Sequence, residues 1–465
     1  MAVVVNGSVV NDDSQVRVVS RRLVKASDSS VKPHVLAVSN LDLIPQTMQT
    51  SMFCIYPRPP TGDFNAVIAA FEAGLPSFLD HFFPFAGRIA TDPSSGLPEI
   101  HCNNHGAELL VGETDVALAS LDYGTMTTSV GRVQQPYGED MALSVQLVSF
   151  ACGGFTVAWC TNHVLVDGSA LSLLVDSWSA LARSGTLAAD RRPNHDRSSV
   201  FRPRAPPSYS DSLDEEFTPL DAERQVNVLT AEQSFVERLY YVEASDVARL
   251  REAASREGTH ATRFQAVVAY LWKALAGVVG TADAHCRVQL WIDGRRRLAA
   301  APELRAAMSN YIGNVTTSVV REACVDEIQR MALPDAAAMV GEAVTAPAYD
   351  EHFQELVDWV EEHKAERYIE TASLGLGSPM VSVTAFTSFS LDTDFGFGHA
   401  AMAMPTSSST ARLCTGFLQI AARPGHDGSW IASAFLWPRL AAALESDVPH
   451  VFKPVTAEYL GLISS

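Results

Sequence analysis

Residues 161–168 hold the side chains with the clearest chemical potential in this chain. His163 is followed by three apolar residues and then by Asp167 and Gly168. A neutral imidazole is the usual side chain for removing a proton near pH 7, so His163 is our candidate catalytic base. A chain with 13 histidines contains about one His-x-x-x-Asp spacing by chance, so a hydrogen-bonded structural histidine is the alternative interpretation of this pattern alone.

The residues on either side predict how this histidine is held. Residues 155–160 are rich in β-branched and aromatic side chains, which favour a buried strand. Apolar residues recur at helical spacing from Leu171 to Leu181, and Gly185 is placed to end that helix. We therefore expect His163 on a loop at the end of a strand, with Gly168 permitting a sharp exit from the loop into the helix.

A second signature, Asp394-Phe395-Gly396-Phe397-Gly398, follows the strand-like residues 380–384. Two glycines flanking an aromatic residue indicate a tight backbone path in which a Cβ atom would clash. The tripeptide Asp-Phe-Gly also occurs in protein kinases. Because neither a Gly-rich loop nor a His-Arg-Asp catalytic loop accompanies it here, we exclude a kinase.

In this order and at this separation, the two signatures resemble those of the plant BAHD acyltransferases, which carry His-x-x-x-Asp and Asp-Phe-Gly-Trp-Gly. The chain resembles the hydroxycinnamoyltransferases of this family, and the resemblance covers nearly the whole chain. Five further segments resemble family motifs: Leu41-Asp42-Leu43, Phe83-Pro84-Phe85-Ala86-Gly87-Arg88, Asp196-Arg197-Ser198, Asp293-Gly294-Arg295 and Tyr311-Ile312-Gly313-Asn314.

The resemblance implies an α/β architecture with two domains, like that of chloramphenicol acetyltransferase. Mixed sheets flanked by helices are expected, with an active-site channel at the domain interface. Residues 1–185 are expected to form the N-terminal acyltransferase domain and residues 227–465 the C-terminal domain. Between them, residues 186–226 are rich in proline, arginine and serine, which predicts a crossover linker. The family further implies that residues 376–401 pack with the N-terminal domain.

The implied activity is transfer of a hydroxycinnamoyl or other aromatic acyl group from acyl-CoA to an alcohol or amine. His163 would deprotonate the attacking nucleophile, a role typically worth about 10²–10⁴-fold in rate. The tetrahedral oxyanion then needs a donor, and its collapse expels the coenzyme A thiolate. The chain has no Gly-x-Ser-x-Gly segment, so we expect direct attack without a covalent acyl-enzyme. Acyl-CoA is a co-substrate in this scheme, and no bound cofactor or metal is expected.

Other residues receive supporting roles from the resemblance. In the family the aspartate of His-x-x-x-Asp turns away from the substrate and pairs with an arginine, for which Arg295 is our candidate partner of Asp167. We assign loop-structural roles to Gly168, Asp394, Gly396 and Gly398 as well. For coenzyme A, hydroxyls and arginines at the start of the predicted helix after residue 263 offer a phosphate site, with a solvated helix cap as the alternative. These residues are Arg256, Thr259, Thr262 and Arg263.

The chain departs from the family pattern at three positions near the expected pocket. We also assign Gln49 to this pocket. Phe397 replaces a tryptophan and so removes an indole N–H that can donate a hydrogen bond to an oxyanion. The alternative is that the ring at this position has only a packing role. Thr387 occupies the position of an arginine in shikimate-type hydroxycinnamoyltransferases, and threonine cannot pair with a carboxylate in bidentate fashion. Shikimate and quinate are therefore expected to be poor acceptors. Ala385 replaces a tryptophan and predicts a wider pocket.

Composition limits the remaining possibilities. The 465 residues are 47% hydrophobic, which supports a large core, and the net charge of −19 disfavours nucleic acid as a partner. The acidic surface either attracts a cationic acceptor such as a polyamine or serves solubility. Seven scattered cysteines without CxxC spacing predict reduced thiols and no zinc site. The chain shows no signal peptide or membrane span, so we expect a cytoplasmic protein. We expect a monomer, since the active site needs no second chain.

Two alternatives to an active acyl-CoA transferase remain. Carrier-protein-dependent condensation enzymes share the fold but usually carry His-His before the x-x-x-Asp-Gly, whereas Asn162 precedes His163 here. A non-catalytic paralogue that binds a ligand or partner is motivated by Phe397 and Ala385. Retention of His163 and Gly168 argues against that alternative.

Overall fold

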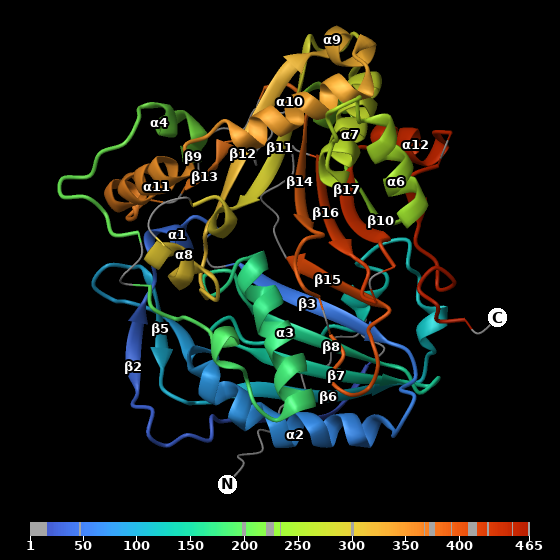
Figure 1. Cartoon of the computed structure of the whole chain (residues 1–465). Coiled ribbons are helices and arrows are strands. Elements are labelled where there is room, and N and C mark those ends of the chain that lie inside the picture. The colour runs from blue at the N-terminus through green and yellow to red at the C-terminus, as the bar shows by residue number, and fades with distance from the viewer. Residues whose placement is uncertain are drawn as a thin grey trace.

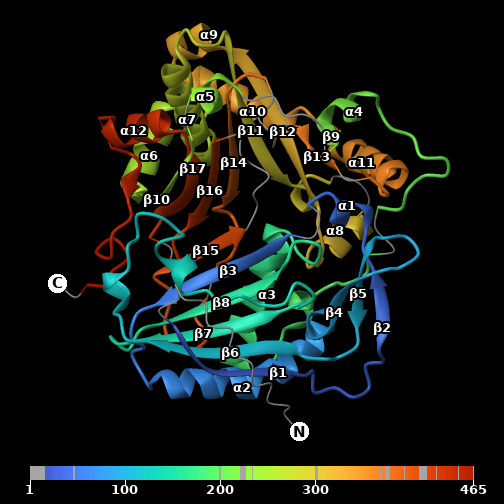
Figure 2. The same cartoon turned by 180° about the vertical axis from the view of Figure 1, so that it is seen from behind.

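Two mixed β-sheets form the frame of the molecule, shown from opposite sides in Figures 1 and 2. The computed structural model describes residues 16–463 except 46–47, 198–200, 220–226, 233, 299–301, 367, 372–376, 392, 408–415, 426 and 449. The first sheet has the strand order β1-β6-β7-β8-β3-β15. Its strands are β1 (Arg17–Val24), β3 (Gln49–Tyr56), β6 (Ala107–Thr114), β7 (Ser144–Phe150), β8 (Phe155–Asn162) and β15 (Met402–Ser407).

The second sheet is built from the C-terminal half, in the order β12-β11-β14-β16-β17-β10-β18. Its strands are β10 (Val236–Val242), β11 (His285–Asp293), β12 (Thr316–Cys324), β14 (Met380–Phe386), β16 (Gly416–Ala422), β17 (Trp430–Leu436) and β18 (Lys453–Pro454). Strands β11, β14 and β16 run parallel, and the other pairs are antiparallel. Two smaller sheets combine β2 (His34–Ala37), β4 (Arg88–Thr91) and β5 (Pro98–Cys102), and β9 (Phe217–Pro219) with β13 (Tyr368–Glu370).

Helices cover these sheets on separate sides. In Figure 1, α2 (Phe64–His81) and α3 (Gly168–Ser184) lie against one face of the first sheet. Helix α7 (Arg263–Val279) contacts α6 (Ala244–Ala253), α10 (Leu333–Thr345) and α12 (Pro438–Ser446) over the second sheet. The remaining helices are α1 (Asn40–Leu43), α4 (Ser212–Glu216), α5 (Val228–Glu232), α8 (Pro302–Met308), α9 (Val325–Arg330) and α11 (Tyr349–His363). None of the helices in the described ranges is long and apolar enough to cross a membrane.

Each sheet has its own apolar core. Aromatic side chains from β8, α2 and α3 stack in the first, where the rings of Phe71 and Trp178 lie 4.4 Å apart between centroids and both contact Trp159. The second core surrounds α7, whose Trp272 is fully buried. These elements form because apolar residues recur at 3.6-residue spacing on the helices, and burying that stripe against a sheet is favourable.

One strand from the C-terminal half completes the first sheet. Strand β15 pairs antiparallel with β3, from Met402 opposite Ile55 to Ser407 opposite Thr50. The sequence led us to expect residues 376–401 with the N-terminal half. Strand β14 instead lies in the second sheet, where Val381 and Val383 are buried in the second core, whereas Phe395 and Ala400 are buried in the first core. The chain therefore leaves the second sheet only after β14.

The predicted linker at 186–226 includes ordered elements, since α4 and β9 lie within its described part. Residues 198–200 and 220–226 of this segment lie outside the described residues. Two arginines attach the linker to the rest of the fold. Arg197 contacts Asp42, and Arg204 contacts the fully buried side chain of Asp358 on α11.

Candidate active site

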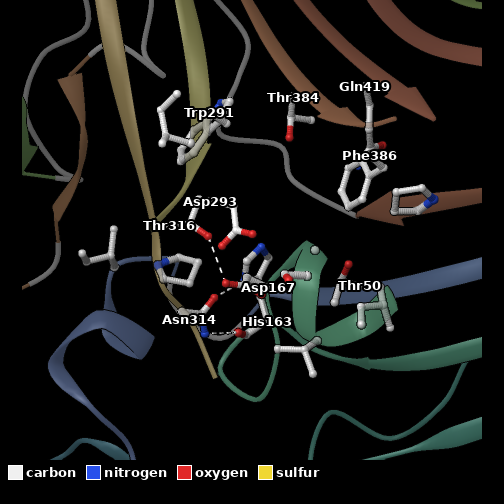
Figure 3. A pocket seen from close by; sticks show the side chains of 18 of the residues that line it. Thr50, His163, Asp167, Trp291, Asp293, Asn314, Thr316, Thr384, Phe386 and Gln419 are labelled. Atoms are coloured by element: carbon white, nitrogen blue, oxygen red, sulfur yellow. Dashed lines mark hydrogen bonds between the residues drawn. The ribbon is translucent and has the colours of Figure 1, made fainter. Parts of the chain in front are cut away.

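A cavity of about 1270 Å³ has walls from both sheets. Figure 3 shows His163 and Asp167 on the loop before α3, facing side chains from β11, β14 and β16. This position at the junction of the two halves is where the resemblance led us to expect the channel. Side chains labelled on the opposite wall are Trp291, Asp293, Thr384, Phe386 and Gln419.

The histidine loop is fixed at both ends. Strand β8 ends at Asn162, whose side-chain oxygen accepts a hydrogen bond from the Val164 N–H at 3.0 Å. The His163 N–H donates to the Met48 carbonyl at 2.7 Å. At the other end Asp167 is the N-cap of α3, with its Oδ1 accepting from the Ala170 N–H at 2.9 Å. An N-cap carboxylate satisfies a backbone donor that the helix itself leaves unpaired.

Asn314 is the side-chain partner of His163 that sequence reasoning missed. The imidazole Nδ1 lies 3.0 Å from the Asn314 Oδ1, and the Asn314 Nδ2 donates to the His163 carbonyl at 2.8 Å. Asn314 lies 151 positions further along the chain, just before β12. The motif 311–314 was visible in the sequence, but nothing local linked it to the histidine.

Asp167 points away from the imidazole and pairs with Arg295. The Arg295 Nη1 donates to Asp167 Oδ2 at 2.6 Å, and the two side chains are 7% and 2% exposed. The Val315 N–H and the Thr316 hydroxyl donate to the same oxygen at 2.9 and 3.1 Å. Burial raises the pKa of Asp167, but the Arg295 charge and these donors outweigh it and hold the pKa below its usual range. The structure thus gives Asp167 a positioning geometry, since both of its carboxylate oxygens accept hydrogen bonds from other residues of the protein.

Gly168 is required by a close contact and not by its backbone angle. Its φ is outside the left-handed region, so the sharp exit from the loop that we predicted does not depend on glycine flexibility. A Cβ atom at this position would lie 2.2 Å from Cε1 of Phe386. The ring of β14 therefore packs directly on the start of α3, which holds the second sheet against the histidine loop.

The Asp394–Gly398 turn lies away from the cavity wall. Asp394 Oδ1 accepts hydrogen bonds from the N–H groups of Gly396 and Gly398 at 2.8 and 3.1 Å, and both glycines have positive φ. Phe395 is buried in the first core and contacts Phe397, with centroids 5.2 Å apart. Phe397 does not line the cavity, so its assignment to the oxyanion pocket was wrong: its ring packs beside the core.

The pocket residues predicted from β14 and β3 do reach the cavity. Gln49, Ala385 and Thr387 all line it. Alternation along β14 buries Val381 and Val383 in the second core, so Thr384 and Phe386 face the other way. The large ring that β14 contributes to this wall is therefore Phe386. Comparing only positions 385 and 387 with the family pattern missed it, whereas the alternation of the strand would have indicated it.

The four residues predicted to bind coenzyme A separate into two groups. Thr262 caps α7, accepting from the Gln265 N–H at 3.1 Å, and lines the cavity together with Gln265. Arg256 forms an ion pair with Asp335, and its backbone pairs with that of Thr259. Arg256, Thr259 and Arg263 do not line the cavity. Within the described residues, no group of three or more histidines, cysteines or carboxylates is arranged to hold a metal.

The site and fold define a class. The fold is similar to that in the crystal structure of F. graminearum TRI101 complexed with coenzyme A and deoxynivalenol. That structure matches with a TM-score of 0.72 over 90% of this chain and 99% of TRI101, at 14% identity. The fold is therefore a two-domain α/β fold of the kind seen in TRI101.

Sequence comparison identifies the family. The family model described as "Transferase family" matches residues 14–450. A putrescine hydroxycinnamoyltransferase of Oryza sativa subsp. japonica is 27% identical over 84% of this chain and 90% of its own length. The omega-hydroxypalmitate O-feruloyl transferase of Arabidopsis thaliana is 24% identical over 82% of both chains. The chain belongs to this Transferase family, the BAHD acyltransferases, and is an acyl-CoA-dependent acyltransferase.

Proposed function

We propose that this enzyme transfers a hydroxycinnamoyl group from its coenzyme A thioester to an amino group of a cationic amine, with His163 as the base. One observation carries the proposal: the His163 loop opens onto a cavity whose walls combine aromatic rings with carboxylates. Each part of that wall matches one part of the two substrates.

Aromatic side chains support a planar aromatic acyl group. They come from several elements that are far apart in the chain, so the apolar surface exists only in the folded protein. Rings of this kind pack well against a flat phenylpropenoyl group. The aromatic residues on the wall are Phe264, Trp291, Tyr368, Phe386, Phe389 and Phe417.

Carboxylates support a cationic acceptor. Asp293, Glu370, Glu139 and Asp140 all line the cavity, whereas the basic residues on its wall are Arg296 and Arg297. A diamine can present one neutral amino group for attack while its second, protonated group remains near a carboxylate. The putrescine-using relative and the net charge of −19 agree with this assignment. An alcohol acceptor, as in the feruloyl transferase relative, is the second candidate.

The proposed chemistry needs no covalent intermediate. The acceptor nitrogen attacks the thioester carbonyl while His163 takes its proton, and the carbonyl oxygen becomes an oxyanion. Thr384 and Gln419 are two of the polar side chains that Figure 3 shows on the facing wall, and we assign them as oxyanion donors in place of Phe397. Collapse of the tetrahedral intermediate breaks the carbon–sulfur bond, and the coenzyme A thiolate takes the proton from His163.

The coenzyme A end is assigned to the start of α7. Thr262 reaches the cavity there, and Arg256, Thr259 and Arg263 lie close to it in sequence on the approach to the helix. The N-terminus of a helix attracts phosphate because its N–H groups and dipole favour negative charge. We further propose that the enzyme is a monomer, since this one chain supplies the cavity, the base and the capped helix. We also propose that it acts in the cytoplasm.

Thiol release from p-coumaroyl-, caffeoyl-, benzoyl-, acetyl- and malonyl-CoA tests the proposal. Each donor is mixed with putrescine, shikimate, an aryl amine or a fatty alcohol, and the product is identified by mass spectrometry. We expect release that needs both an aromatic acyl-CoA and putrescine, that is lost in His163→Ala and that persists in the exposed control His105→Ala. Turnover with shikimate would contradict the acceptor assignment. Binding of acyl-CoA without any turnover would favour the non-catalytic alternative.

A further inference from the structure

A buried ion pair connects two distant segments, α1 and the crossover linker, to the His163 loop. Asp42 of α1 and Arg197 of the crossover linker lie 2.7 Å apart, and their side chains are 0% and 2% exposed. The Arg197 guanidinium also donates to the carbonyls of Val164 and Leu165, at 2.9 and 2.8 Å. Both carbonyls belong to the loop between His163 and Asp167, so the linker arginine fixes the backbone of that loop directly.

The same carboxylate holds Asn314. Asp42 Oδ1 accepts hydrogen bonds from the Asn314 backbone N–H at 2.8 Å and from its Nδ2 at 2.9 Å. The other oxygen, Oδ2, accepts from Arg197 and from the N–H and hydroxyl of Ser39, each at 2.7 Å. Every partner of this carboxylate is a donor, so its place in the network is that of an acceptor only.

These partners determine which way the Asn314 amide faces. Its Nδ2 lies between the Asp42 carboxylate and the His163 carbonyl, and neither of those groups can donate a proton. The amide nitrogen must therefore occupy that side, and the amide oxygen must face the His163 Nδ1. An oxygen acceptor at 3.0 Å requires the proton of a neutral imidazole to be on Nδ1. Nε2 then carries the lone pair that a general base uses.

We propose that Asp42, held by Arg197, is a positioning residue that fixes the His163 tautomer through Asn314. This inference rests on the proposed role of His163 as the base. The Asp167–Arg295 pair holds the far end of the same loop, but Asp167 makes no contact with the Asn314 side chain. The two buried aspartates therefore have different roles. Asp167 holds the loop in place, and Asp42 fixes which ring nitrogen of His163 carries the proton.

Asp42→Asn tests this role with almost no change in shape. The new amide nitrogen can take the place of either carboxylate oxygen. In one orientation it faces the donors of Asn314, and in the other it faces those of Ser39 and Arg197. Turned toward Asn314, it favours a flipped Asn314 amide whose nitrogen meets His163 Nδ1, which moves the ring proton to Nε2. Loss of tautomer control in other enzymes costs about 10²–10⁴-fold in kcat, and we expect a decrease of at least about 10²-fold here. The KM for acyl-CoA should change less than about threefold, since Asp42 does not line the cavity.

Asp358→Asn is the matched control. Asp358 is also a fully buried aspartate that holds the crossover linker, through Arg204 and the Ser208 N–H, but it makes no contact with the histidine loop. Both variants weaken the attachment of the linker and lower the free energy of unfolding. Only Asp42→Asn should lower kcat, and Asp358→Asn should retain it within about threefold if the role of Asp42 is positional.

Nitrogen-15 NMR of the histidine rings gives a readout that does not depend on turnover or on the folding of Asp42→Asn. The His163 signals are assigned by their absence in His163→Gln. In the wild-type protein, at a pH where the imidazole is neutral, we expect the proton on Nδ1. A proton on Nε2 in the wild type would overturn the inference, as would equal losses of kcat in Asp42→Asn and Asp358→Asn. A wild-type protein with the Nδ1 tautomer but no acyl transfer would contradict the proposed function alone.

Discussion

The side chains of the two signature segments form their hydrogen bonds in different ways. The His163 loop is held from outside, by Asn314, Arg197 and Arg295, each more than 30 positions away in sequence. In the Asp394–Gly398 turn, the Asp394 side chain bonds within the turn, to two N–H groups that follow it by two and four residues, while Arg183 donates to the Asp394 carbonyl from outside. The first segment faces the cavity and the second packs beside the first core. A clear motif therefore does not reveal whether its residues act on substrate or only shape the backbone.

Removing Asp167 should have the largest effect, because the externally held loop loses its buried ion pair. Asp167→Ala leaves the 7% exposed Arg295 side chain without its Asp167 partner. We expect the free energy of unfolding to fall by about 3–5 kcal/mol, together with loss of transferase activity. Urea denaturation measures the change. A loss below about 1 kcal/mol would show that the pair does not hold the loop.

The same pair predicts a pH dependence of stability. The pKa of Asp167 lies below its unfolded value of about 3.9, because Arg295 and the neighbouring donors overcome the cost of burial. Its contribution is therefore fully present above about pH 4 and is lost as the pH falls through the lower folded pKa. Urea midpoints between pH 7 and pH 3 should fall more steeply in the wild type than in Asp167→Asn. Parallel pH profiles would contradict this prediction.

Gly168→Ala tests the contact between the two halves. The added methyl group would overlap the Phe386 ring, so we expect about 1–3 kcal/mol of destabilisation and a lower kcat from a displaced loop. The double variant Gly168→Ala with Phe386→Leu should recover part of both losses, measured by urea denaturation and thiol release. Additive losses would mean that the contact with Phe386 is not the reason for glycine at this position.

A smaller effect is expected in the internally held turn. Asp394→Ala removes the acceptor of two backbone donors and should lower the free energy of unfolding by about 1–2 kcal/mol. Because this turn does not line the cavity, the kcat of the folded protein should stay within about twofold of wild type. Comparison with Asp167→Ala by the same assays separates a loop that supports chemistry from a turn that supports the fold.

The smallest effect is expected for Phe397→Trp, which restores the residue typical of the family. The Phe397 ring packs beside the first core and does not line the cavity. We expect kcat to change less than about twofold and stability by less than about 1.5 kcal/mol, the range for hydrophobic exchanges of similar size. A tenfold gain in kcat would show that an indole N–H at this position reaches the oxyanion after all.

The sequence alone predicted the local framework of the site. The apolar patterns on either side of residues 161–168 indicated a strand, a loop and a helix, and the structure has β8 ending at Asn162 and α3 beginning at Gly168. The spaced motifs also indicated the family and the two-domain α/β fold, both of which the comparisons confirm. Local structure and family are readable because they depend on side-chain periodicity and on short motifs.

Only the tertiary structure decided which of these motifs meet. Asp42, Arg197 and Asn314 were visible as parts of separate motifs, yet their bonds span 155 and 272 positions. The same holds for Phe386 against Gly168, and for Phe397, whose place off the cavity wall depends on how the chain returns to β15 beside β3. No local pattern encodes such contacts, because they follow from the packing of two sheets against each other. That packing, through buried hydrogen bonds between distant segments, sets the orientation of Asn314 and of the His163 ring.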